Sequence, residues 1–286
     1  MNRRRFIIVT GLSGAGKSIA LHALEDASFY CVDNLPAGLL MNFAEFVEKD
    51  DVPRYPQVAV GVDARNPAAD LSRFPGFLEA LSEMAFDVEL IYIEASDQTL
   101  INRFSETRRR HPLSSSEQPL GQAIAQERFV METLSDRADL RIDTTHTNVH
   151  EFRALIANRV AHRSTDALSL QVSSFGYKNG VPPDADFVFD LRCLPNPYWD
   201  PALRELSGRD QAIQDFLRAE PTVGTMVSDI VAFLERWIPA FEADNRSYLT
   251  IAMGCTGGRH RSVYVAERVA AHFETGRRIM VVHRNS

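Results

Sequence analysis

Two glycine-rich stretches carry the residue types that bind phosphate groups. The first, GLSGAGKS, matches the pattern G-x4-G-K-[ST]. Glycines let a loop wrap a phosphate with backbone N–H groups, and the positive end of a following helix adds to the attraction. In this pattern Lys17 reaches the terminal phosphates and Ser18 can bind Mg²⁺. The stretch predicts a nucleotide-binding loop that consists of Gly11, Leu12, Ser13, Gly14, Ala15, Gly16, Lys17 and Ser18.

A carboxylate at a neighbouring strand end is expected to hold the water shell of the metal. Asp33 follows the apolar run FYCV, and Asp63 follows VAVGV. Asp63 is slightly favoured as the metal-side acid because its apolar run leads almost directly into it. Asp33 could instead orient water or a substrate. Either residue could also cap a turn, so the sequence does not order them.

Cationic side chains gather between residues 102 and 112. In kinases of small metabolites, an arginine-bearing lid closes over the phosphates and neutralises the charge that develops during transfer. A solvated basic helix end is the other interpretation, because cations are favoured at a helix C-terminus. Both interpretations stay open for Arg103, Arg108, Arg109, Arg110 and His111.

The second stretch, GCTGGRHRS, has the spacing of a cysteine-dependent phosphatase. Cys255 is followed six residues later by Arg261 and then by a serine. Loop amides near a helix N-terminus and an arginine fork would bind a phosphate monoester in an enzyme or in a receptor. An enzyme also needs a general acid, and Asp200 is the only suggestive candidate. We therefore favour a non-catalytic phosphate-binding loop with Cys255 at its base; a nucleophilic or a purely structural cysteine are the alternatives. No residue is assigned a catalytic role.

Polar residues follow the apolar run ADFVFDLR and are candidates for the same site. A carboxylate from Asp190, a guanidinium from Arg192 and an amide from Asn196 would suit a hydroxylated or aminated sugar phosphate. The alternative is that Asp190 and Arg192 pair with each other and that the prolines of LPNPYWDP only fix a turn.

Strands and helices must position the first loop. Apolar runs predict strands, and residues at helical spacing predict helices between them. Such alternation indicates a parallel sheet covered on both faces, which makes the fold class α/β. The strands are expected at 5–10, 29–33, 57–63, 88–95 and 140–145, and helical stretches at 18–27, 100–110 and 151–161.

A second series of elements follows a polar, unpatterned stretch at 162–167. It predicts a smaller α/β domain that holds the phosphate-binding loop, so the domains are expected at 1–162 and 168–286. Strands are expected at 170–177, 185–192, 248–253 and 277–284, and helical segments at 211–241 and 262–276.

Composition limits the class of protein. A chain of 286 residues exceeds what one hydrophobic core usually serves. The formal net charge of -7 argues against coating nucleic acid by bulk electrostatics. Three cysteines without CxxC spacing fit a reducing cytoplasm better than a disulfide framework. No segment reaches the ~18 apolar residues of a membrane span, and the apolar run near the start is too short for a signal peptide.

The motifs GLSGAGKS, FYCVDNLP, GVDARN, SFGYKNGVP, FVFDLRCLPNPYW and GCTGGRHRSVYVAE closely resemble the RapZ/YvcJ family of bacterial P-loop proteins. The resemblance covers both halves of the chain. It implies a kinase-like N-terminal domain that binds ATP and GTP and hydrolyses them weakly, and a C-terminal phosphosugar pocket. Carried over by motif, the GTP-associated stretch is Asp63, Ala64, Arg65 and Asn66. The pocket candidates are Asp190, Arg192, Asn196, Cys255, Thr256, Gly257, Gly258, His260 and Arg261.

The resemblance also implies partners. RapZ members are RNase adapters: they sense glucosamine-6-phosphate, bind small RNAs that control glucosamine-6-phosphate synthase and present these RNAs to ribonuclease E. Family members are expected to be homo-oligomers. Residues 255 to 286 carry six arginines and two glutamates, so a local basic surface is expected for RNA. RapZ proteins that act on small RNAs have a C-terminal extension rich in Lys and Arg, whereas this sequence carries only Arg277, Arg278 and Arg284 near its end. The candidate RNA contacts are Arg268, Arg277, Arg278 and Arg284.

These observations predict a cytoplasmic two-domain regulator that binds nucleotide and a phosphorylated amino sugar and acts on RNA or protein partners. As an enzyme it would be at most a weak ATPase or GTPase. A small-molecule kinase that uses Lys17, Ser18 and an aspartate is the alternative from another class.

Overall fold

The computed structural model describes residues 3–49, 55–114, 118–161, 168–244, 246–274 and 279–284. The chain divides into two compact units, Met1–Thr165 and Asp166–Ser286. Each unit has its own parallel sheet and its own helices, so the α/β expectation is confirmed. The expected linker at 162–167 lies outside the described residues. No helix among the described residues has the length and apolar character needed to cross a membrane.

The sheet of the N-terminal unit has a buried central strand. Its strands are β1 (Arg4–Gly11), β2 (Tyr30–Val32), β3 (Gln57–Gly61), β4 (Phe86–Glu94) and β5 (Leu140–Asp143). They are parallel and follow the order β2-β3-β1-β4-β5. β1 therefore pairs on both sides, and its carboxyl end opens into the first glycine loop at the middle of the sheet.

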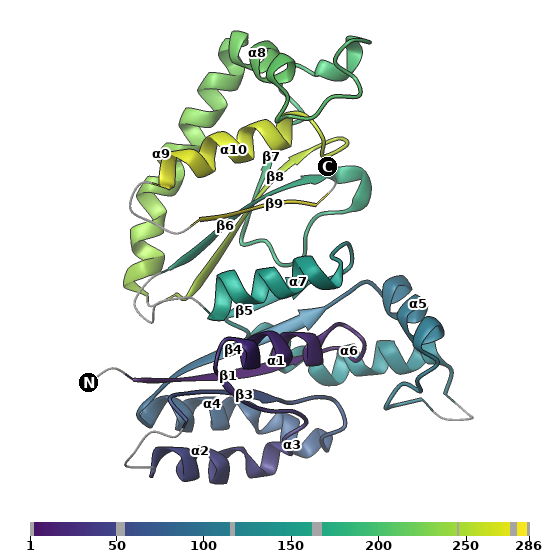
Figure 1. Cartoon of the computed structure of the whole chain (residues 1–286), viewed down its shortest axis with the longest axis vertical. Helices are drawn as coiled ribbons and strands as arrows, with labels where there is room; N and C mark the ends of the chain where they lie inside the picture. Colours follow the sequence, from purple (N-terminus) through teal and green to yellow (C-terminus); the bar gives the residue numbers. More distant parts are fainter. Residues whose placement is uncertain are drawn as a thin grey trace. The chain divides into compact units, whose positions relative to one another are not determined.

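Helices cover both faces of this sheet (Figure 1). The helices of this unit are α1 (Lys17–Asp26), α2 (Leu40–Glu48), α3 (Ala68–Ser72), α4 (Phe74–Glu83), α5 (Asp97–Thr107), α6 (Leu120–Asp136) and α7 (Val149–Leu155), with a 3₁₀ turn at Ala37–Leu39 and a π-helical turn at Ile156–Ala161. α1 and α7 pack together on one face, and α2, α4 and α6 lie on the other. A core of Phe6, Ile8, Val60, Leu90 and Met131 joins that second group to the sheet.

The sequence predicted the strands better than the helices on the second face. Helices α2, α3, α4 and α6 were not among the helical stretches expected from the sequence, although the buried residues of α2, Leu40, Ala44 and Val47, lie at helical spacing. The segment expected to be helical at 100–110 ends earlier, since α5 stops at Thr107 and Arg108 adopts a left-handed conformation with φ 52°.

The C-terminal unit repeats the parallel arrangement with four strands. These are β6 (Ser169–Gly176), β7 (Phe187–Asp190), β8 (Tyr248–Cys255) and β9 (Ile279–His283). Their order is β7-β8-β6-β9, so β8, which leads into the second glycine loop, is an inner strand. The helices are α8 (Gln211–Ala219), α9 (Pro221–Ala243) and α10 (Arg261–Phe273), with 3₁₀ turns at Tyr177–Asn179 and Pro197–Trp199.

The long helical segment expected at 211–241 is two helices. Glu220 has extended backbone angles of φ -90° and ψ 111°, and Pro221 begins the next helix. A proline fits the first turn of a helix but disfavours a helical conformation in the residue before it. The break lets α8 and α9 pack around one core with α10, β6 and β8.

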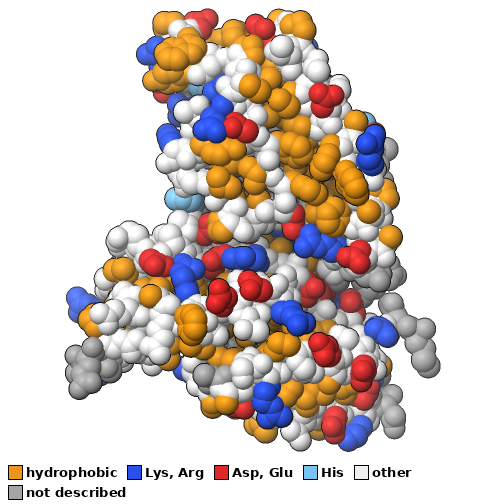
Figure 2. Space-filling model, turned by 180° about the vertical axis from the view of Figure 1, so that it is seen from behind, with side chains coloured by type: hydrophobic (Ala, Val, Ile, Leu, Met, Phe, Trp, Pro, Cys, Tyr) orange, Lys and Arg blue, Asp and Glu red, His pale blue; other side chains and the backbone are white. Residues whose placement is uncertain are grey.

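Apolar side chains also gather on the surface of the C-terminal unit (Figure 2). Phe233 of α9 lies 5.3 Å and 5.7 Å, centroid to centroid, from Phe187 and Phe189 of the edge strand β7. Phe233 and Trp237 each stay more than a third exposed, and their rings lie 6.4 Å apart. We call Phe187, Phe189, Phe233 and Trp237 the β7–α9 surface. Exposed apolar patches of this kind are typical of protein contact surfaces.

Candidate functional site

The first glycine loop starts at a point where only glycine fits. Gly11 has φ 127°, and a Cβ atom built there would lie 1.9 Å from the carbonyl oxygen of Ile93 on β4. Gly16, at the start of α1, has φ 123°, and its Cβ would press on the ring of Phe152 at 3.0 Å. The glycines therefore follow from the close approach of the loop to its neighbours as well as from the phosphate-binding pattern.

The loop presents free amides and a cation. In the described part of the chain, the N–H groups of Gly14 and Gly16 donate to no acceptor, and those of Lys17 and Ser18 lie in the first turn of α1, where no intrahelical partner exists. The ammonium of Lys17 donates to the carbonyls of Gly11 at 2.7 Å and Leu12 at 3.1 Å. Burial lowers the pKa of Lys17, and nearby carboxylates, with Glu127 first among them, oppose that change.

The two aspartates expected near the metal differ in surroundings. Asp33 follows β2, and its carboxylate accepts a hydrogen bond from the Ser18 hydroxyl at 3.3 Å. Asp63 follows β3 and accepts two hydrogen bonds from the Arg65 guanidinium at 2.6 Å and 2.9 Å. Burial works to raise the pKa of Asp63, but Arg65 and Lys17 outweigh it and hold that pKa below its ordinary value. The sequence favoured Asp63, whereas the geometry favours Asp33 as the neighbour of Ser18.

Residues 63 to 66 form a turn that bonds mainly to itself. The side-chain amide of Asn66 donates to the Asp63 carbonyl at 3.0 Å, and its oxygen accepts from the Ala37 N–H at 2.6 Å. Ala64 is buried, and the side chain of Arg65 is half exposed. Asn66 thus fixes the turn to the segment after β2, and Arg65 is the member that solvent or a ligand can reach.

The arginine segment divides into two parts. Arg103 is held in place: its guanidinium donates to the carbonyl of Gly14 at 3.2 Å and to the carbonyl of Thr144 at 2.7 Å. The hydroxyl of Thr144 in turn donates to the Ala15 carbonyl at 2.8 Å. Arg103 therefore fastens the glycine loop to the end of β5, and the exposed cations of the expected lid are Arg108, Arg109 and Arg110.

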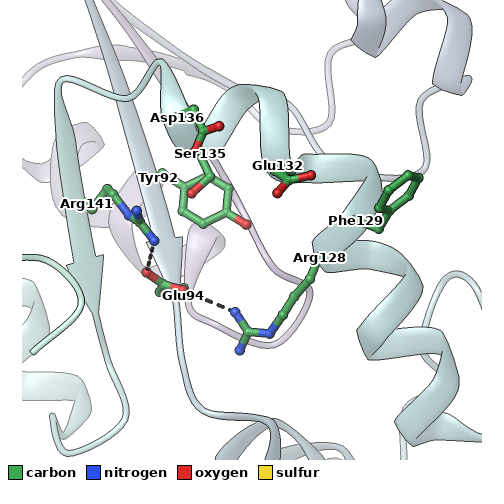
Figure 3. A pocket seen from close by; sticks show the side chains of 8 residues that line it. All are labelled: Tyr92, Glu94, Arg128, Phe129, Glu132, Ser135, Asp136 and Arg141. Carbon is green, nitrogen blue, oxygen red and sulfur yellow. Dashed lines mark hydrogen bonds and ion pairs between the residues drawn. The ribbon is translucent and has the colours of Figure 1, made fainter. Parts of the chain in front are cut away.

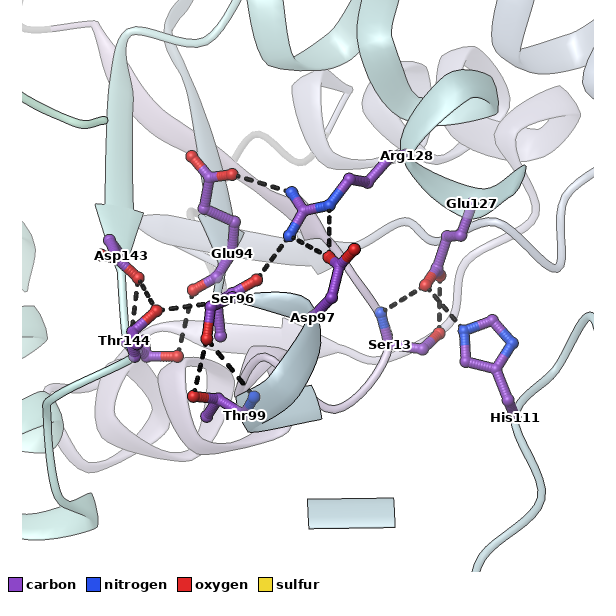
Figure 4. A network of polar contacts seen from close by, with 12 residues as sticks. Ser13, Glu94, Ser96, Asp97, Thr99, His111, Glu127, Arg128, Asp143 and Thr144 are labelled. Carbon is purple, nitrogen blue, oxygen red and sulfur yellow. Dashed lines mark hydrogen bonds and ion pairs between the residues drawn. The ribbon is translucent and has the colours of Figure 1, made fainter. Parts of the chain in front are cut away.

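His111 is not a lid residue. Its ring is buried and its Nε2 lies 2.9 Å from a carboxylate oxygen of Glu127 on α6. Glu127 is fully buried and also accepts from Ser13, from the N–H at 2.9 Å and from the hydroxyl at 2.7 Å (Figure 4). Burial works to raise the pKa of Glu127, but the bonds from His111 and Ser13 and the charge of Lys17 leave it below its ordinary value.

The sequence reasoning missed Glu127, although one signal was present. α6 buries Ala123, Ile124, Met131 and Leu134, and Glu127 continues the same helical stripe. A carboxylate at a core-facing position must find donors, because a buried charge without partners is strongly unfavourable. Residue spacing along the sequence does not identify those donors, His111 and Ser13, because they lie 16 and 114 positions away.

An open pocket of about 290 Å³ lies beside this network, between α6 and the strands β4 and β5 (Figure 3). Glu94 accepts from Arg141 at 2.9 Å and from Arg128 at 3.2 Å, so the central charges of the pocket neutralise one another. Arg128 also pairs with Asp97 at 2.8 Å. These pairs join α6 to the sheet behind the loop. The lining residues are Tyr92, Glu94, Arg128, Phe129, Glu132, Ser135, Asp136 and Arg141.

The second glycine loop connects β8 to α10 in the C-terminal unit. Cys255 is buried at its base, and its sulfur accepts from the Gly258 N–H at 3.2 Å and lies 3.2 Å from the Ser262 hydroxyl. The amides of Gly257, Arg259 and His260 donate to no acceptor in the described part of the chain. The loop therefore offers free N–H groups next to a helix N-terminus, the arrangement that favours an anion.

Arg261 is fixed more firmly than a flexible phosphate clamp would be. It is buried, and one guanidinium nitrogen donates to the carbonyls of Arg192 at 3.0 Å and Leu194 at 2.9 Å. A second nitrogen reaches the Thr256 hydroxyl at 3.4 Å, and Nε has no partner among the described residues. Arg261 thus draws the turn after β7 toward the loop.

Asp190 and Arg192 pair with each other, as the alternative interpretation had it. The guanidinium donates to both carboxylate oxygens of Asp190, with a shortest distance of 2.6 Å, and holds the pKa of this carboxyl below its ordinary value. Arg192 also lies 3.9 Å above the ring of Tyr177. Tyr177 was not among the expected site residues, yet it forms the wall on which Arg192 rests.

Two other expected residues serve the turn after β7. Asn196 accepts from the Tyr198 N–H at 3.4 Å and begins a 3₁₀ turn. Asp200, the only suggestive general acid, accepts from the Ala202 N–H at 2.9 Å and so caps a turn. His260 is buried, and its Nε2 contacts the Arg204 carbonyl at 3.1 Å, which ties the loop to the same turn. The structure thus places no acid of this turn in contact with Cys255.

The residues proposed for RNA separate in the structure. Arg268 is exposed on α10. Arg284 pairs with both carboxylate oxygens of Asp184, at 2.5 Å and 2.6 Å, and only 13% of its side chain is exposed. Its charge is therefore largely compensated within the protein. Arg277 and Arg278 lie outside the described residues.

Taken together, the two units define an α/β protein of the P-loop class with a second, glycine-rich loop of similar design. Residues 5–164 match the RapZ-like N-terminal domain, and residues 168–286 match the RapZ C-terminal domain. The chain belongs to the RapZ family. The family resemblance seen in the sequence motifs is thereby confirmed.

Relatives are similar over the whole length. A protein of Alkalilimnicola ehrlichii is 51% identical over 285 residues, which is 99% of each chain. A protein of Nitrosococcus oceani is 51% identical over 278 residues, 97% of this chain and 98% of its own. Both are named nucleotide-binding protein.

Solved structures are similar to part of the chain. Shikimate kinase from Acinetobacter baumannii, in complex with shikimate, is 16% identical and covers 55% of this chain and 93% of its own, with a TM-score of 0.36. A gluconokinase from Sinorhizobium meliloti is 14% identical and covers 55% and 94%, with a TM-score of 0.35. Similarity at this level identifies neither a substrate nor an activity.

His260 makes the stability of the C-terminal unit depend on pH. Burial lowers the pKa of His260, more than its carbonyl contacts raise it, so the unfolded chain binds the proton more readily than the folded one. Stability is therefore retained above the unfolded pKa of about 6.5 and is lost as the pH falls through it toward the folded pKa. We expect the free energy of unfolding to fall between pH 7.5 and 5.5, and His260→Gln to reduce that loss.

Urea unfolding followed by tryptophan fluorescence measures this change, because both tryptophans, Trp199 and Trp237, lie in the C-terminal unit. His272→Gln is the comparison variant: His272 is exposed on α10 of the same unit and pairs with Glu235 at 2.8 Å, so only a change in pH dependence beyond that of His272→Gln is assigned to His260. An equal pH dependence in wild type and His260→Gln would show that His260 does not carry the effect.

Proposed function

We propose that the protein is a nucleotide-binding regulator of the RNase adapter type, with at most weak ATPase or GTPase activity. Its N-terminal loop binds ATP or GTP. The observation that carries this proposal is the set of free amides that surround Lys17 at the start of α1, a cradle of donors for phosphate oxygens. The name nucleotide-binding protein borne by relatives about half identical to this chain supports it.

Mg²⁺ fits the same site. Magnesium prefers oxygen ligands and usually keeps several waters beside one or two protein groups and the phosphates. The Ser18 hydroxyl and the Asp33 carboxylate lie 3.3 Å apart and supply oxygen donors of this type. When bound, the ion would neutralise phosphate charge, with Ser18 and Asp33 as its nearest protein groups; Asp63 remains the second candidate.

Lys17→Ala tests nucleotide binding. A hydrogen bond from a charged group contributes about 1.5–3 kcal/mol of free energy, so the loss of the Lys17 ammonium should weaken ATP and GTP binding by roughly 10- to 100-fold. Calorimetry measures the dissociation constants, and Lys49→Ala, an exposed lysine that follows α2, should bind like wild type. Failure of wild type to bind either nucleotide would refute the proposal. Phosphorylation of a small metabolite at about 1 per second or faster would favour the kinase alternative.

For the C-terminal loop we propose a receptor for a phosphorylated amino sugar such as glucosamine-6-phosphate. The free amides of Gly257, Arg259 and His260 would take the phosphate. Asp190 and Arg192 lie beside the loop, because Arg261 bonds to the Arg192 carbonyl, and they offer a carboxylate for an amine and a cation for an oxygen. The engagement of Asp200 in a turn supports a receptor over a phosphatase.

Cys255→Ser separates receptor from phosphatase. If Cys255 only fills the base of the loop, the variant should bind glucosamine-6-phosphate within about threefold of wild type, because a hydroxyl can replace the sulfur as acceptor. The exposed Cys193→Ser is the matched control. Titration calorimetry measures sugar-phosphate binding, and a phosphatase assay on the same preparations measures turnover. If the wild type has phosphatase activity and only Cys255→Ser abolishes it, the receptor proposal is contradicted.

We further propose, from family membership, that the C-terminal unit binds small RNA and presents it to ribonuclease E. Of the proposed contacts in the described residues, the exposed Arg268 supports this best. The β7–α9 surface supports a homo-oligomer, since an exposed aromatic patch is typical of a protein contact surface. Regulation of amino-sugar metabolism in a cytoplasmic setting would follow from these partners.

The basic residues near the end of the sequence test RNA binding. An Arg277→Ala, Arg278→Ala double variant should bind a hairpin RNA more weakly, and the slope of log affinity against log salt should fall by about two, one for each lost phosphate contact. Arg137→Ala, exposed in the N-terminal unit, serves as the control. Unchanged affinity and slope in the double variant would refute a role for these two arginines.

A further inference from the structure

Glu127 lies directly behind the tip of the nucleotide loop. It comes from α6, is fully buried, and accepts hydrogen bonds from the N–H and the hydroxyl of Ser13 at 2.9 Å and 2.7 Å. None of the motifs singled out in the sequence contains it. A buried carboxylate beside a loop that binds anions is unexpected, because it repels the ligand that the loop attracts.

The hydrogen bonds define the charge of this group. The Leu113 N–H donates to Nδ1 of His111 at 3.1 Å, so Nδ1 carries no proton. The proton of the neutral ring is then on Nε2, which donates to Glu127 at 2.9 Å. Glu127 thus accepts three hydrogen bonds and donates none, which is the environment of an ionised carboxylate.

A single peptide group separates Glu127 from Lys17. The N–H of the Leu12–Ser13 peptide donates to Glu127, and the C=O of the same peptide accepts from the Lys17 ammonium at 3.1 Å. Because the two bonds of a trans peptide point in opposite directions, the carboxylate and the ammonium face each other across it. Of the charges near Lys17, Glu127 acts on it most strongly. Lys17 is the residue that reaches the terminal phosphates in this motif.

We propose that Glu127 determines how many phosphates the nucleotide loop prefers, by opposing the terminal phosphate of a nucleoside triphosphate and leaving the diphosphate favoured. This inference rests on the proposed nucleotide binding. The added phosphate brings its charge to the Lys17 end of the loop, where Glu127 already shares the cation. A diphosphate places less charge there, so it experiences less of the repulsion.

Glu127 is poorly arranged to act as a general base instead. Both of its oxygens are engaged by Ser13 and His111, and its pKa lies below the ordinary value of a glutamate. A base must be free to take a proton and works best when its pKa lies near the operating pH. The geometry is that of a fixed charge.

Glu127→Gln removes the charge and preserves the contacts. One amide oxygen can accept from the Ser13 N–H and from His111, and the amide nitrogen can donate to the Ser13 hydroxyl, which turns to accept. Glu127→Asp keeps the charge but shortens the side chain by one methylene. Glu132→Gln, on the exposed side of α6, removes a carboxylate away from the loop and is the matched control.

Calorimetry with Mg²⁺, ADP and a non-hydrolysable ATP analogue measures the preference on the full chain. Wild type should bind ADP at least as tightly as the ATP analogue. In Glu127→Gln the affinity for the analogue should rise on the order of tenfold relative to that for ADP. The ratio of the two affinities should stay at the wild-type value in Glu127→Asp and Glu132→Gln.

Each outcome is decisive. Wild type that binds the ATP analogue more tightly than ADP overturns the proposal, and this measurement needs no variant to fold. If the ratio of the two affinities is unchanged in folded Glu127→Gln, or if both ligands bind equally more weakly, Glu127 has only a structural role and the proposal is refuted. Absence of binding of either nucleotide to wild type refutes the proposed function itself, whereas binding with an unchanged ratio refutes only this inference.

Discussion

Both candidate sites depend on one constraint, the close approach of backbone to backbone where a glycine loop passes a neighbouring strand end. At Gly11 a side chain would meet the Ile93 carbonyl at 1.9 Å, and at Gly176, the last residue of β6, it would meet the backbone of Gly257 at 2.6 Å. In each unit the contact presses the loop against the sheet next to the strand from which it emerges. The loop amides are thereby turned away from the strand ladders and stay available to an anion.

The same backbone design is completed by different cations in the two units. In the N-terminal loop Lys17 bonds to carbonyls of the loop itself, and a flexible ammonium can exchange these for phosphate oxygens. In the C-terminal loop Arg261 is buried and bonds to carbonyls of the turn after β7. Its planar group therefore fixes the turn beside the loop, and the loop amides are the donors that remain for an anion. The cation of the first loop can therefore move to a ligand, whereas the cation of the second loop is fixed in advance.

The sequence predicted those parts of the fold and site whose signals are local. The strands that enter both loops, the glycines and Lys17 could be identified because each depends on a few adjacent residues. The choice between Asp33 and Asp63 could not be made, because it depends on Arg65, which neutralises Asp63, and on the approach of Asp33 to Ser18. Neither of the two interpretations left open for His111, a lid residue or a solvated helix end, fits its burial, for the same reason: its partner Glu127 is distant in sequence. Helix α2 was not expected, although its buried residues Leu40, Ala44 and Val47 carry a local signal of the same kind.

Glu127 connects the rigidity of the nucleotide loop with its selectivity. A buried carboxylate is strongly unfavourable unless donors satisfy it, and here Ser13 and His111 do so while Lys17 lies across one peptide. Hydrogen bonds to a charged group contribute about 1.5–3 kcal/mol each, enough to hold the Ser13 end of the loop before any nucleotide arrives. The same charge must then act on whatever binds beside Lys17, because a fixed buried charge is little screened. A loop preformed in this way gains order at the expense of attraction for the outermost phosphate, so its rigidity and its preference for the shorter ligand have a common physical cause.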